Sequence, residues 1–573
     1  MNPSPSSSPT TTPYPSNEEI LSQIKSNQSN QTSFLSQMVS IDSTLEKGEE
    51  EVMDFIWNFL KTSFSSQEFE MEKVPMNESI LRNLPGFSPI HWKYGNQYNI
   101  VLRNKQQQQQ LSESNKSLIL CGHADVVPST TTTTSSSWTK CTTPFTPTIH
   151  LNRLYGRGSG DMKAGLSCMI YALLTLQQLH YIPSGTLQLE IVCEEECTGN
   201  GCLALRHHAA ASSSSSLGEK KKFDAVIIPE PFPFIVTAQL GVLWFQLHIV
   251  GKPAHVLDTS LGINAIEVAF DMYRHLQSTL QVEYNTNINS REEEEENQAF
   301  KDIKQPICFN VGKIKGGDWA SSVPSFCDMD VRVGFFPSQS VECVKHDVEE
   351  CLRKFVLESS NDTMKHVKYD ITYFGFQADG AVLLEEFCNN NNDDDNDVDD
   401  EVSKEEEEGK GDDSIPLSAV SNDEKETVVQ DSETMGINET KDDNDERRRK
   451  KLKQTNDKSD IHSSSEQRSS LQKEFVALLQ QSHHSATTIT ANTDNTTNTT
   501  NNNNTTTLPL KPITCTTDAR FYKLYSQIPC VTCFGPEAMN IHGVDESVCL
   551  QSVQDVTATL ALFIRDWCGL NQV

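Results

Sequence analysis

Residues 117–125 read Ser-Leu-Ile-Leu-Cys-Gly-His-Ala-Asp, a short apolar run that ends in His123 and Asp125. The apolar part is typical of a buried β-strand. A histidine and an acid that follow such a strand lie at the carboxyl edge of its sheet, where open α/β sheets bind ligands. This stretch therefore predicts a polar site at the edge of a buried sheet.

Four more segments place a metal-type ligand after an apolar run or a glycine-rich turn. Two histidines and three carboxylates form a donor set that suits a pair of Zn²⁺ ions, and Co²⁺ or Mn²⁺ would also suit it. Taken alone, His123 is better explained by a polar turn and Asp161 by a helix cap, and Glu230 and His542 are at least as well explained by ordinary loops. A solvated acidic loop is the alternative for Glu196. The five residues are His123, Asp161 in Gly-Arg-Gly-Ser-Gly-Asp-Met-Lys, Glu196 in Val-Cys-Glu-Glu-Glu-Cys, Glu230 in Ile-Ile-Pro-Glu-Pro, and His542 in Asn-Ile-His-Gly-Val-Asp-Glu.

The neighbours of these ligands suggest supporting roles. Asp125 is close enough in sequence to orient the ring of His123, as in carboxylate–histidine–metal arrangements. Asp161 precedes a strongly apolar helical pattern at residues 162–178 and is expected at the N-cap, although its two oxygens could also bridge two cations. In an extended segment, adjacent acids of residues 194–196 would point to opposite sides, so one could bind metal while the next serves as a general base.

The pattern of elements indicates an α/β fold with an inserted domain. Strands alternate with helices in the first part of the chain, which favours a parallel or mixed sheet covered on both faces. After residue 234 the order becomes βαββαβ, which indicates a small α+β domain. We expect main-sheet strands at 99–103, 117–121, 186–193, 225–229 and 529–534, and helices at 46–62, 162–178, 473–480 and 549–568. In the inserted domain we expect strands at 236–250, 306–314, 326–333 and 367–374, and helices at 265–280 and 342–356.

Low-complexity tracts explain the unusual composition of the 573-residue chain. Hydrophobic residues make up 36% and the net charge is -32, but residues 389–446 alone hold 23 acidic and 4 basic residues. Such a segment buries too little apolar surface to fold, and partner binding is its alternative use. The expected parts are a disordered tail (1–30), a catalytic domain (31–235, 376–387 and 471–573), a lid domain (236–375) and a disordered acidic insertion (388–470).

Several compartments and partners are disfavoured. The sixteen cysteines have no regular spacing, and the N-terminus lacks the features of a secretory signal. No run of about 18 apolar residues is present. The basic run at 447–451 resembles a nucleic-acid or nuclear-localisation patch, but it adjoins the acidic tract and can pair with it. We therefore expect a cytoplasmic protein that binds neither membrane nor nucleic acid.

Six motifs in order resemble the M20 metallopeptidase family, and within it the branch of acetylornithine deacetylase and succinyl-diaminopimelate desuccinylase. They are Gly-His-x-Asp-Val-Val-Pro, Gly-Arg-Gly-x-x-Asp-Met-Lys, Glu-Glu-x-x-Gly-Asn-Gly, Pro-Glu-Pro, Gly-x-x-Ala-His and Ile-His-Gly-Val-Asp-Glu. The likeness spans residues 40–380 and 510–570. It implies a mixed-sheet di-zinc catalytic domain, an inserted α+β lid that forms a homodimer, and long disordered insertions.

The resemblance also assigns roles residue by residue. His123 and Glu230 would hold one zinc, Glu196 and His542 the other, and Asp161 would bridge them. Asp125 would orient His123, and Glu195 would be the general acid/base. His255 would stabilise the oxyanion in the partner's site, and Arg332 would hold a substrate carboxylate. Ser322, where many members have Asn, and the loop of Thr517, Asp518 and Arg520 would contact substrate.

The implied function is a metal-dependent amidohydrolase that removes an acyl group from an N-acyl amino acid. N-acetylornithine, cleaved to ornithine and acetate in arginine biosynthesis, is the favoured substrate. An aminoacylase, dipeptidase or carboxypeptidase of the same family is the close alternative. A non-catalytic scaffold that binds partners through its acidic insertion belongs to a different class. The scaffold is disfavoured because all five ligands and Glu195 are present.

Overall fold

The computed structural model describes residues 14–105, 115–129, 138–212, 223–286, 295–360, 362–388, 458–493 and 507–573. The predicted tail at 1–13 and most of the predicted acidic insertion, residues 389–457, lie outside the described residues. Within the described ranges, residues 14–388 and 467–573 belong to one compact unit. No helix within the described ranges is long and apolar enough to cross a membrane.

A six-stranded mixed sheet forms the centre of the catalytic domain, as the alternating pattern predicts. Its order is β1-β2-β7-β3-β8-β16, with the last four strands parallel and the first two antiparallel to their neighbours. Strands β3, β7 and β8 are buried throughout, because helices cover both faces. The strands are β1 (Phe69–Pro75), β2 (Tyr98–Asn104), β3 (Leu118–His123), β7 (Leu187–Val192), β8 (Ala225–Ile228) and β16 (Cys530–Cys533).

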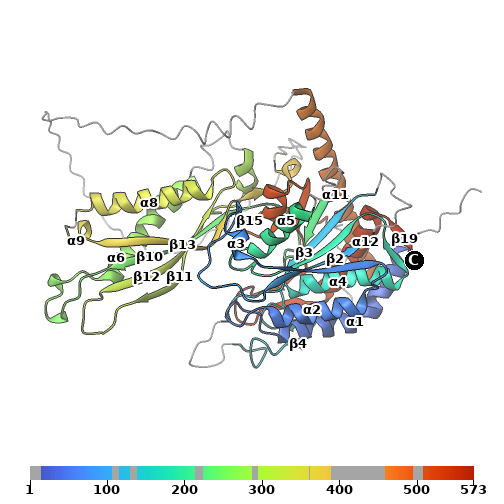
Figure 1. Cartoon of the computed structure of the whole chain (residues 1–573), viewed down its shortest axis with the longest axis horizontal. Helices are drawn as coiled ribbons and strands as arrows, with labels where there is room; N and C mark the ends of the chain where they lie inside the picture. The colour runs from blue at the N-terminus through green and yellow to red at the C-terminus, as the bar shows by residue number, and fades with distance from the viewer. Residues whose placement is uncertain are drawn as a thin grey trace, which may run out of the picture. The chain divides into compact units, whose positions relative to one another are not determined.

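Four helices share a hydrophobic core with one face of this sheet: α1 (Asn17–Ser40), α2 (Glu50–Ser63), α4 (Lys163–Gln178) and α12 (Leu550–Cys568). Figure 1 shows α1, α2 and α4 on the same side of β2. Helix α5 (Asn200–Ser212) packs in a separate core on the opposite face. These layers leave the ends of the strands free to carry loops with polar side chains.

The prediction of a disordered tail is wrong for residues 17–30, which lie in α1. Ser16 caps this helix in a reciprocal arrangement with Glu19, and Ile20 and Ile24 are buried one turn apart. The helical pattern was missed because apolar residues are few in this segment and are separated by Ser, Asn and Gln. These polar residues are not all solvated, since Gln31 is fully buried and hydrogen-bonds Ser167 and Thr557.

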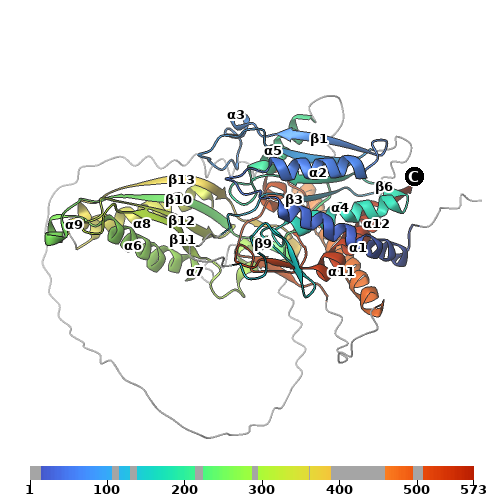
Figure 2. The same ribbon diagram turned by 90° about the horizontal axis from the view of Figure 1, so that it is seen from below.

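The lid domain is a four-stranded antiparallel sheet with two helices on one face. Its order is β11-β12-β10-β13, and the strands lie side by side in Figure 2. A separate core joins the sheet to α6 and α8. A π-helical turn over Gln277–Gln281 ends α6 earlier than the predicted helix at 265–280. The elements are β10 (Gly241–Val250), α6 (Ala265–Leu276), β11 (Phe309–Gly316), β12 (Phe326–Phe335), α8 (Val341–Glu358) and β13 (Lys368–Ala378).

Smaller elements connect the lid and complete the catalytic domain. Strand β9 (Ile235–Gln239) pairs with β14 (Ala381–Val382) and β15 (Leu510–Ile513) where the chain enters and leaves the lid. Strands β5 (Arg153–Tyr155) and β18 (Ser547–Cys549) pair beside the predicted site. Helix α11 (Lys458–Thr493) begins within the predicted disordered insertion and is far longer than the predicted 473–480.

Candidate active site

His123 is the last residue of the central strand β3, so its side chain emerges at the carboxyl edge of the sheet. It is 1% exposed. Its Nε2 atom lies 3.1 Å from Asp161 Oδ1, 3.8 Å from Glu230 Oε1 and 4.0 Å from Glu195 Oε2. Burial disfavours the charged ring, but hydrogen bonds to Asp125 and Asp161 outweigh it and raise the pKa of His123. The end of β3 thus places one histidine among three carboxylates.

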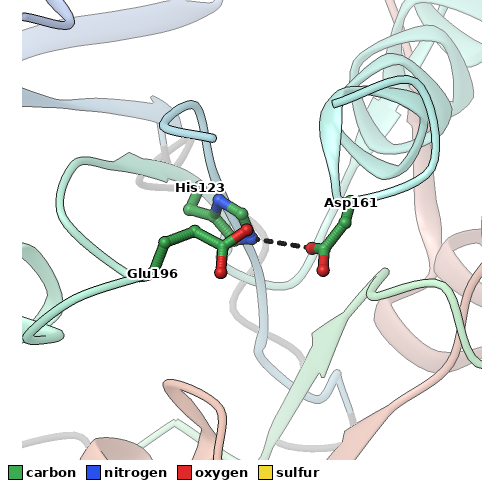
Figure 3. A group of neighbouring side chains, drawn as sticks. All are labelled: His123, Asp161 and Glu196. Atoms are coloured by element: carbon green, nitrogen blue, oxygen red, sulfur yellow. Dashed lines mark hydrogen bonds and ion pairs between the residues drawn. The ribbon is translucent and has the colours of Figure 1, made fainter. Parts of the chain in front are cut away.

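Asp161 lies between two histidines, with one carboxylate oxygen near each. His123 Nε2 is 3.1 Å from Oδ1, and His542 Nε2 is 3.3 Å from Oδ2. Figure 3 shows Asp161 and Glu196 on either side of His123. The prediction that Asp161 caps α4 is wrong, because the helix begins at Lys163 and Met162 is its N-cap residue. The carboxylate is therefore free to face the histidines.

His542 brings a distant loop to the same group. Its Nε2 atom lies 3.1 Å from Glu196 Oε2, although the two residues are far apart in sequence. Burial opposes protonation, but the bonds to Asp161 and Glu196 raise the pKa of His542 to about 11. The site therefore pairs His542 with Glu196, as it pairs His123 with Glu230, and Asp161 stands between the pairs.

A tight turn, not an extended segment, carries Glu195 and Glu196. Strand β7 ends at Val192, and Glu194 adopts a left-handed backbone with φ of 60°. The expectation that alternation along a strand separates the two acids is therefore wrong. The side chain of Glu194 is held away from the histidines by Trp92 Nε1 and Tyr94 OH, both at 2.8 Å.

Asp125 supports this turn as well as His123. The nearest partner of His123 Nδ1 is the backbone carbonyl of Asp125 at 3.0 Å, and the carboxylate lies at 3.4 Å. The same carboxylate accepts the backbone N–H groups of Glu195 at 3.1 Å and Glu196 at 2.9 Å. One buried acid therefore fixes both the His123 loop and the turn that carries two further site residues.

The donor set fits two divalent cations. Ligand atoms of His123, Asp161 and Glu196 lie within 4.8 Å of one another, and so do those of His123, Glu195 and Glu230. Burial, followed by the negative charge of Asp161, raises the pKa of both Glu196 and Glu230. Crowded carboxylates of this kind need positive charge to remain ionised, and divalent cations supply it.

Glu195 is 6% exposed and lies among other acids. Burial raises its pKa well above the ordinary value; His123 opposes this shift, and Asp518 and Glu230 add to it. Neither carboxylate oxygen of Asp518 has a hydrogen-bond partner within the described ranges, and burial raises its pKa to about 7. This unpaired buried acid adds to the negative charge that faces the site.

The predicted substrate residues are not all beside the two histidines. Arg520 is 2% exposed and donates to the backbone carbonyls of Thr517 and Thr198, both at 3.0 Å. Arg332, on lid strand β12, donates to the carbonyls of Thr514 and Cys308 at 3.3 Å. These contacts tie loops together, and their predicted substrate contacts remain predictions.

His255 and Ser322 come together on the lid. They form an isolated antiparallel β-bridge, and His255 Nδ1 accepts a hydrogen bond of 3.1 Å from the backbone N–H of Leu257. The His255 side chain is exposed. The two residues thus share one surface of the lid, and their roles in the reaction also remain predictions.

The sequence pattern gave no role to Arg157 and Glu546, which are buried beside the site. Arg157 follows the first glycine of the glycine-rich turn, and Glu546 ends the His-Gly-Val-Asp-Glu motif. Their guanidinium and carboxylate groups form an ion pair in which both side chains are 1% exposed. The sequence did contain a signal for this pair. Arg157 and Glu546 have opposite charges, and each lies within a motif that also supplies a proposed ligand.

Comparison with known proteins identifies the class and the family. The profile of the peptidase family M20/M25/M40 matches residues 119–566, so the chain belongs to this family of metallohydrolases. An acetylornithine deacetylase of Pectobacterium carotovorum is 30% identical over 243 residues, which are 41% of this chain and 54% of that protein. A succinyl-diaminopimelate desuccinylase of Polynucleobacter necessarius is 27% identical over 44% of this chain and 60% of that protein.

A solved structure extends the similarity in fold to nearly the whole chain. The di-peptidase Dug1p of Saccharomyces cerevisiae matches with a TM-score of 0.60 and 14% identity, over 96% of this chain and 98% of that one. By contrast, the chain spans little more than half the length of the curated relatives described above. The family and fold are thus established, and the substrate is a separate question.

Proposed function

We propose that the protein hydrolyses the amide bond of N-acyl amino acids, with N-acetylornithine as the leading substrate. The observation that carries the proposal is the position of Glu195, whose carboxylate lies 4.0 Å from His123 Nε2 within the group of proposed metal ligands. The partial identity to acetylornithine deacetylases supports the choice of substrate.

In the proposed arrangement, His123 and Glu230 would hold one cation, Glu196 and His542 would hold the other, and Asp161 would be a ligand shared by both. The two ions, when bound, lower the pKa of water and polarise the scissile carbonyl. Zn²⁺ is the first choice for these ligands, with Co²⁺ and Mn²⁺ as alternatives.

Glu195 is the proposed general base and acid. Its carboxylate takes a proton from the attacking water and later gives it to the leaving amine. In the metal-free site, burial raises the pKa of Glu195, His123 opposes this shift, and Asp518 and Glu230 add to it. The backbone N–H of Glu195 is held by Asp125, so the base keeps its position through both transfers. Arg332 is the proposed partner of the substrate carboxylate.

A homodimer formed through the lid is part of the proposal. Val256, Leu257 and Leu261 follow His255 and are 46%, 90% and 62% exposed, and Trp319 is 74% exposed. Contact with a second copy would bury these apolar side chains and could bring His255 to the partner's site, where it would stabilise the oxyanion. Sedimentation of wild-type protein and a Leu257→Asp variant tests this, and a monomeric wild type contradicts it.

The function is tested by steady-state hydrolysis with zinc-loaded protein. The substrate panel is N-acetylornithine, other N-acyl amino acids, dipeptides and longer peptides. Preference for N-acetylornithine, abolished by Glu195→Gln, supports the proposal. A Glu195-dependent preference for dipeptides or for C-terminal peptide residues makes the protein a dipeptidase or carboxypeptidase, and preference for other acyl amino acids makes it an aminoacylase. No Glu195-dependent turnover on the panel contradicts the proposal and favours the scaffold.

A further inference from the structure

The carboxylate of Glu546 is enclosed by donors from the glycine-rich turn that precedes α4. Its Oε1 atom accepts the backbone N–H groups of Gly160 at 2.9 Å and Asp161 at 3.2 Å. Its Oε2 atom accepts the N–H of Gly158 at 3.1 Å and pairs with Arg157. Because one of these donors is the backbone of Asp161 itself, the Glu546 side chain fixes the proposed bridging ligand.

Arg157 connects the same carboxylate to the loop of His542. While Nη1 pairs with Glu546, Nη2 donates to the backbone carbonyl of His542 at 3.1 Å. The backbone of His542 has φ of 62°. Its side chain is 52% exposed, so little packing holds the ring in place. The guanidinium is therefore a tether between two ligand loops that are far apart in sequence.

The glycines of the turn make this enclosure possible. Gly158 has φ of 77°, a left-handed conformation that other residues adopt at a cost. A Cβ atom on Gly160 would lie 2.6 Å from the Cβ of Ala538, which is too close for a real contact. Only a turn without these side chains can wrap its N–H groups around the Glu546 carboxylate. The turn is thus shaped to receive an acid from the other loop.

We propose that Arg157 and Glu546 are positioning residues that set the geometry of Asp161 relative to His542, and so the affinity of the half-site of Glu196, His542 and Asp161 for its cation. The opposite half-site shares Asp161, but its other two ligands are His123, at the end of β3, and Glu230, which follows β8. Those two ligands are not held by this pair. The inference rests on the proposed function only in requiring that the ligand groups bind metal.

The test is a calorimetric titration of metal-free protein with Zn²⁺, in which the two binding events are resolved with a competing chelator. In Glu546→Gln the amide keeps the volume but loses the charge, and its NH₂ group would face N–H donors. We expect the binding event that belongs to the His542 half-site to lose about 10- to 100-fold in affinity. The other event, which shares only Asp161 with this half-site, should lose less. Loss of the same event in His542→Ala identifies which one it is.

Glu537→Gln is the matched control. Glu537 pairs with Arg153 at 2.9 Å and joins the same two regions of the chain, but its side chain is 53% exposed and contacts no proposed ligand. This variant should bind both ions as the wild type does. Thermal unfolding of the metal-free variants reports any general loss of stability separately from the affinities.

Arg157→Lys serves as a milder second variant if Glu546→Gln does not fold. Lysine can pair with Glu546 but cannot also donate to the His542 carbonyl through a second planar nitrogen. A selective, smaller loss at the His542 half-site is expected. Unchanged affinities, or equal loss at both half-sites, would overturn the proposal. The titration uses no substrate, so it tests this inference separately from the proposed function. If the protein binds two ions but hydrolyses no N-acyl amino acid, the proposed function is wrong and this inference is unaffected.

Discussion

The Oδ1 atom of Asp125 accepts a hydrogen bond of 3.1 Å from the backbone N–H of Glu195. The residue expected to orient His123 therefore also fixes the proposed general base. Asp125 can contact both residues because β3 and β7 are neighbouring parallel strands. The loop after β3 and the turn after β7 therefore begin at the same edge of the sheet. The base and the first histidine are thus coupled through one buried carboxylate.

Asp125→Asn should reduce both catalysis and metal affinity. The amide cannot accept two backbone N–H bonds as a carboxylate does, so the turn loses part of its anchor. We expect kcat/KM to fall by about 10- to 100-fold, with weaker zinc binding. Steady-state hydrolysis and zinc titration measure the two effects. Asp224→Asn is the control, since Asp224 accepts the N–H of Ser117 at 2.7 Å before the first residues of β3 and β8, at the end of the sheet opposite the site. Equal losses in both variants would contradict a site-specific role.

Glu195→Gln should separate chemistry from metal binding. The amide keeps the shape of the side chain but cannot accept the proton of water, so kcat should fall by about 100- to 10,000-fold. The variant should still bind two zinc ions, as measured by elemental analysis, because Glu195 is not one of the five proposed ligands. Parallel loss of zinc and activity would instead make Glu195 a ligand, which its place in one of the two ligand groups allows.

We expect protonation of the partly buried His483 to lower the free energy of unfolding in mild acid. Its ring packs against Phe534, and Nδ1 lies 3.1 Å from Thr559 Oγ1. Burial lowers the pKa of His483 from 6.5 to about 4. Between these values the unfolded chain binds more protons, so the contribution of His483 is complete above about pH 6.5 and is lost as the pH falls toward about 4.

The size of this effect is on the order of 2 kcal/mol after allowance for partial exposure. It is measured from urea unfolding of metal-free wild type and His483→Gln at about pH 7.5 and about pH 5. The wild type should lose more stability between the two pH values than the variant does. An identical pH dependence would show that His483 does not titrate in this window.

Gly165→Ala should destabilise the protein next to the site. A Cβ atom at Gly165 would lie 1.9 Å from the backbone oxygen of Pro229, so α4 would have to move away from the residue that precedes Glu230. Such overpacking costs about 1–3 kcal/mol. Thermal unfolding of the metal-free protein measures it. Gly312→Ala, where the nearest atom is 4.0 Å away, is the control. A Gly165→Ala variant as stable as Gly312→Ala would contradict the close packing.

Local patterns were sufficient for the elements that they encode within a few residues. The apolar runs predicted strands β3, β7 and β8, and the stripe at 162–178 predicted α4 apart from its first residue. The sequence patterns did not predict elements whose conformation depends on contacts with residues far away in the chain. Residues 17–30 are poor in apolar side chains, yet the buried Asn27 donates to Thr175 and Gln178 of α4. Gln31, the next buried amide of α1, bonds Ser167 of α4 and Thr557 of α12.

The sequence by itself determined the chemistry of the site, because each proposed ligand follows its own strand or turn and residue type is local information. Only the tertiary structure decided which ligands meet. It brought His542 within 3.1 Å of Glu196, turned Asp161 away from the helix that it was expected to cap, and enclosed Glu546 in the glycine-rich turn. The contacts of His542 and Glu546 join residues that are hundreds of positions apart, and their geometry depends on the packing of the whole sheet and its loops.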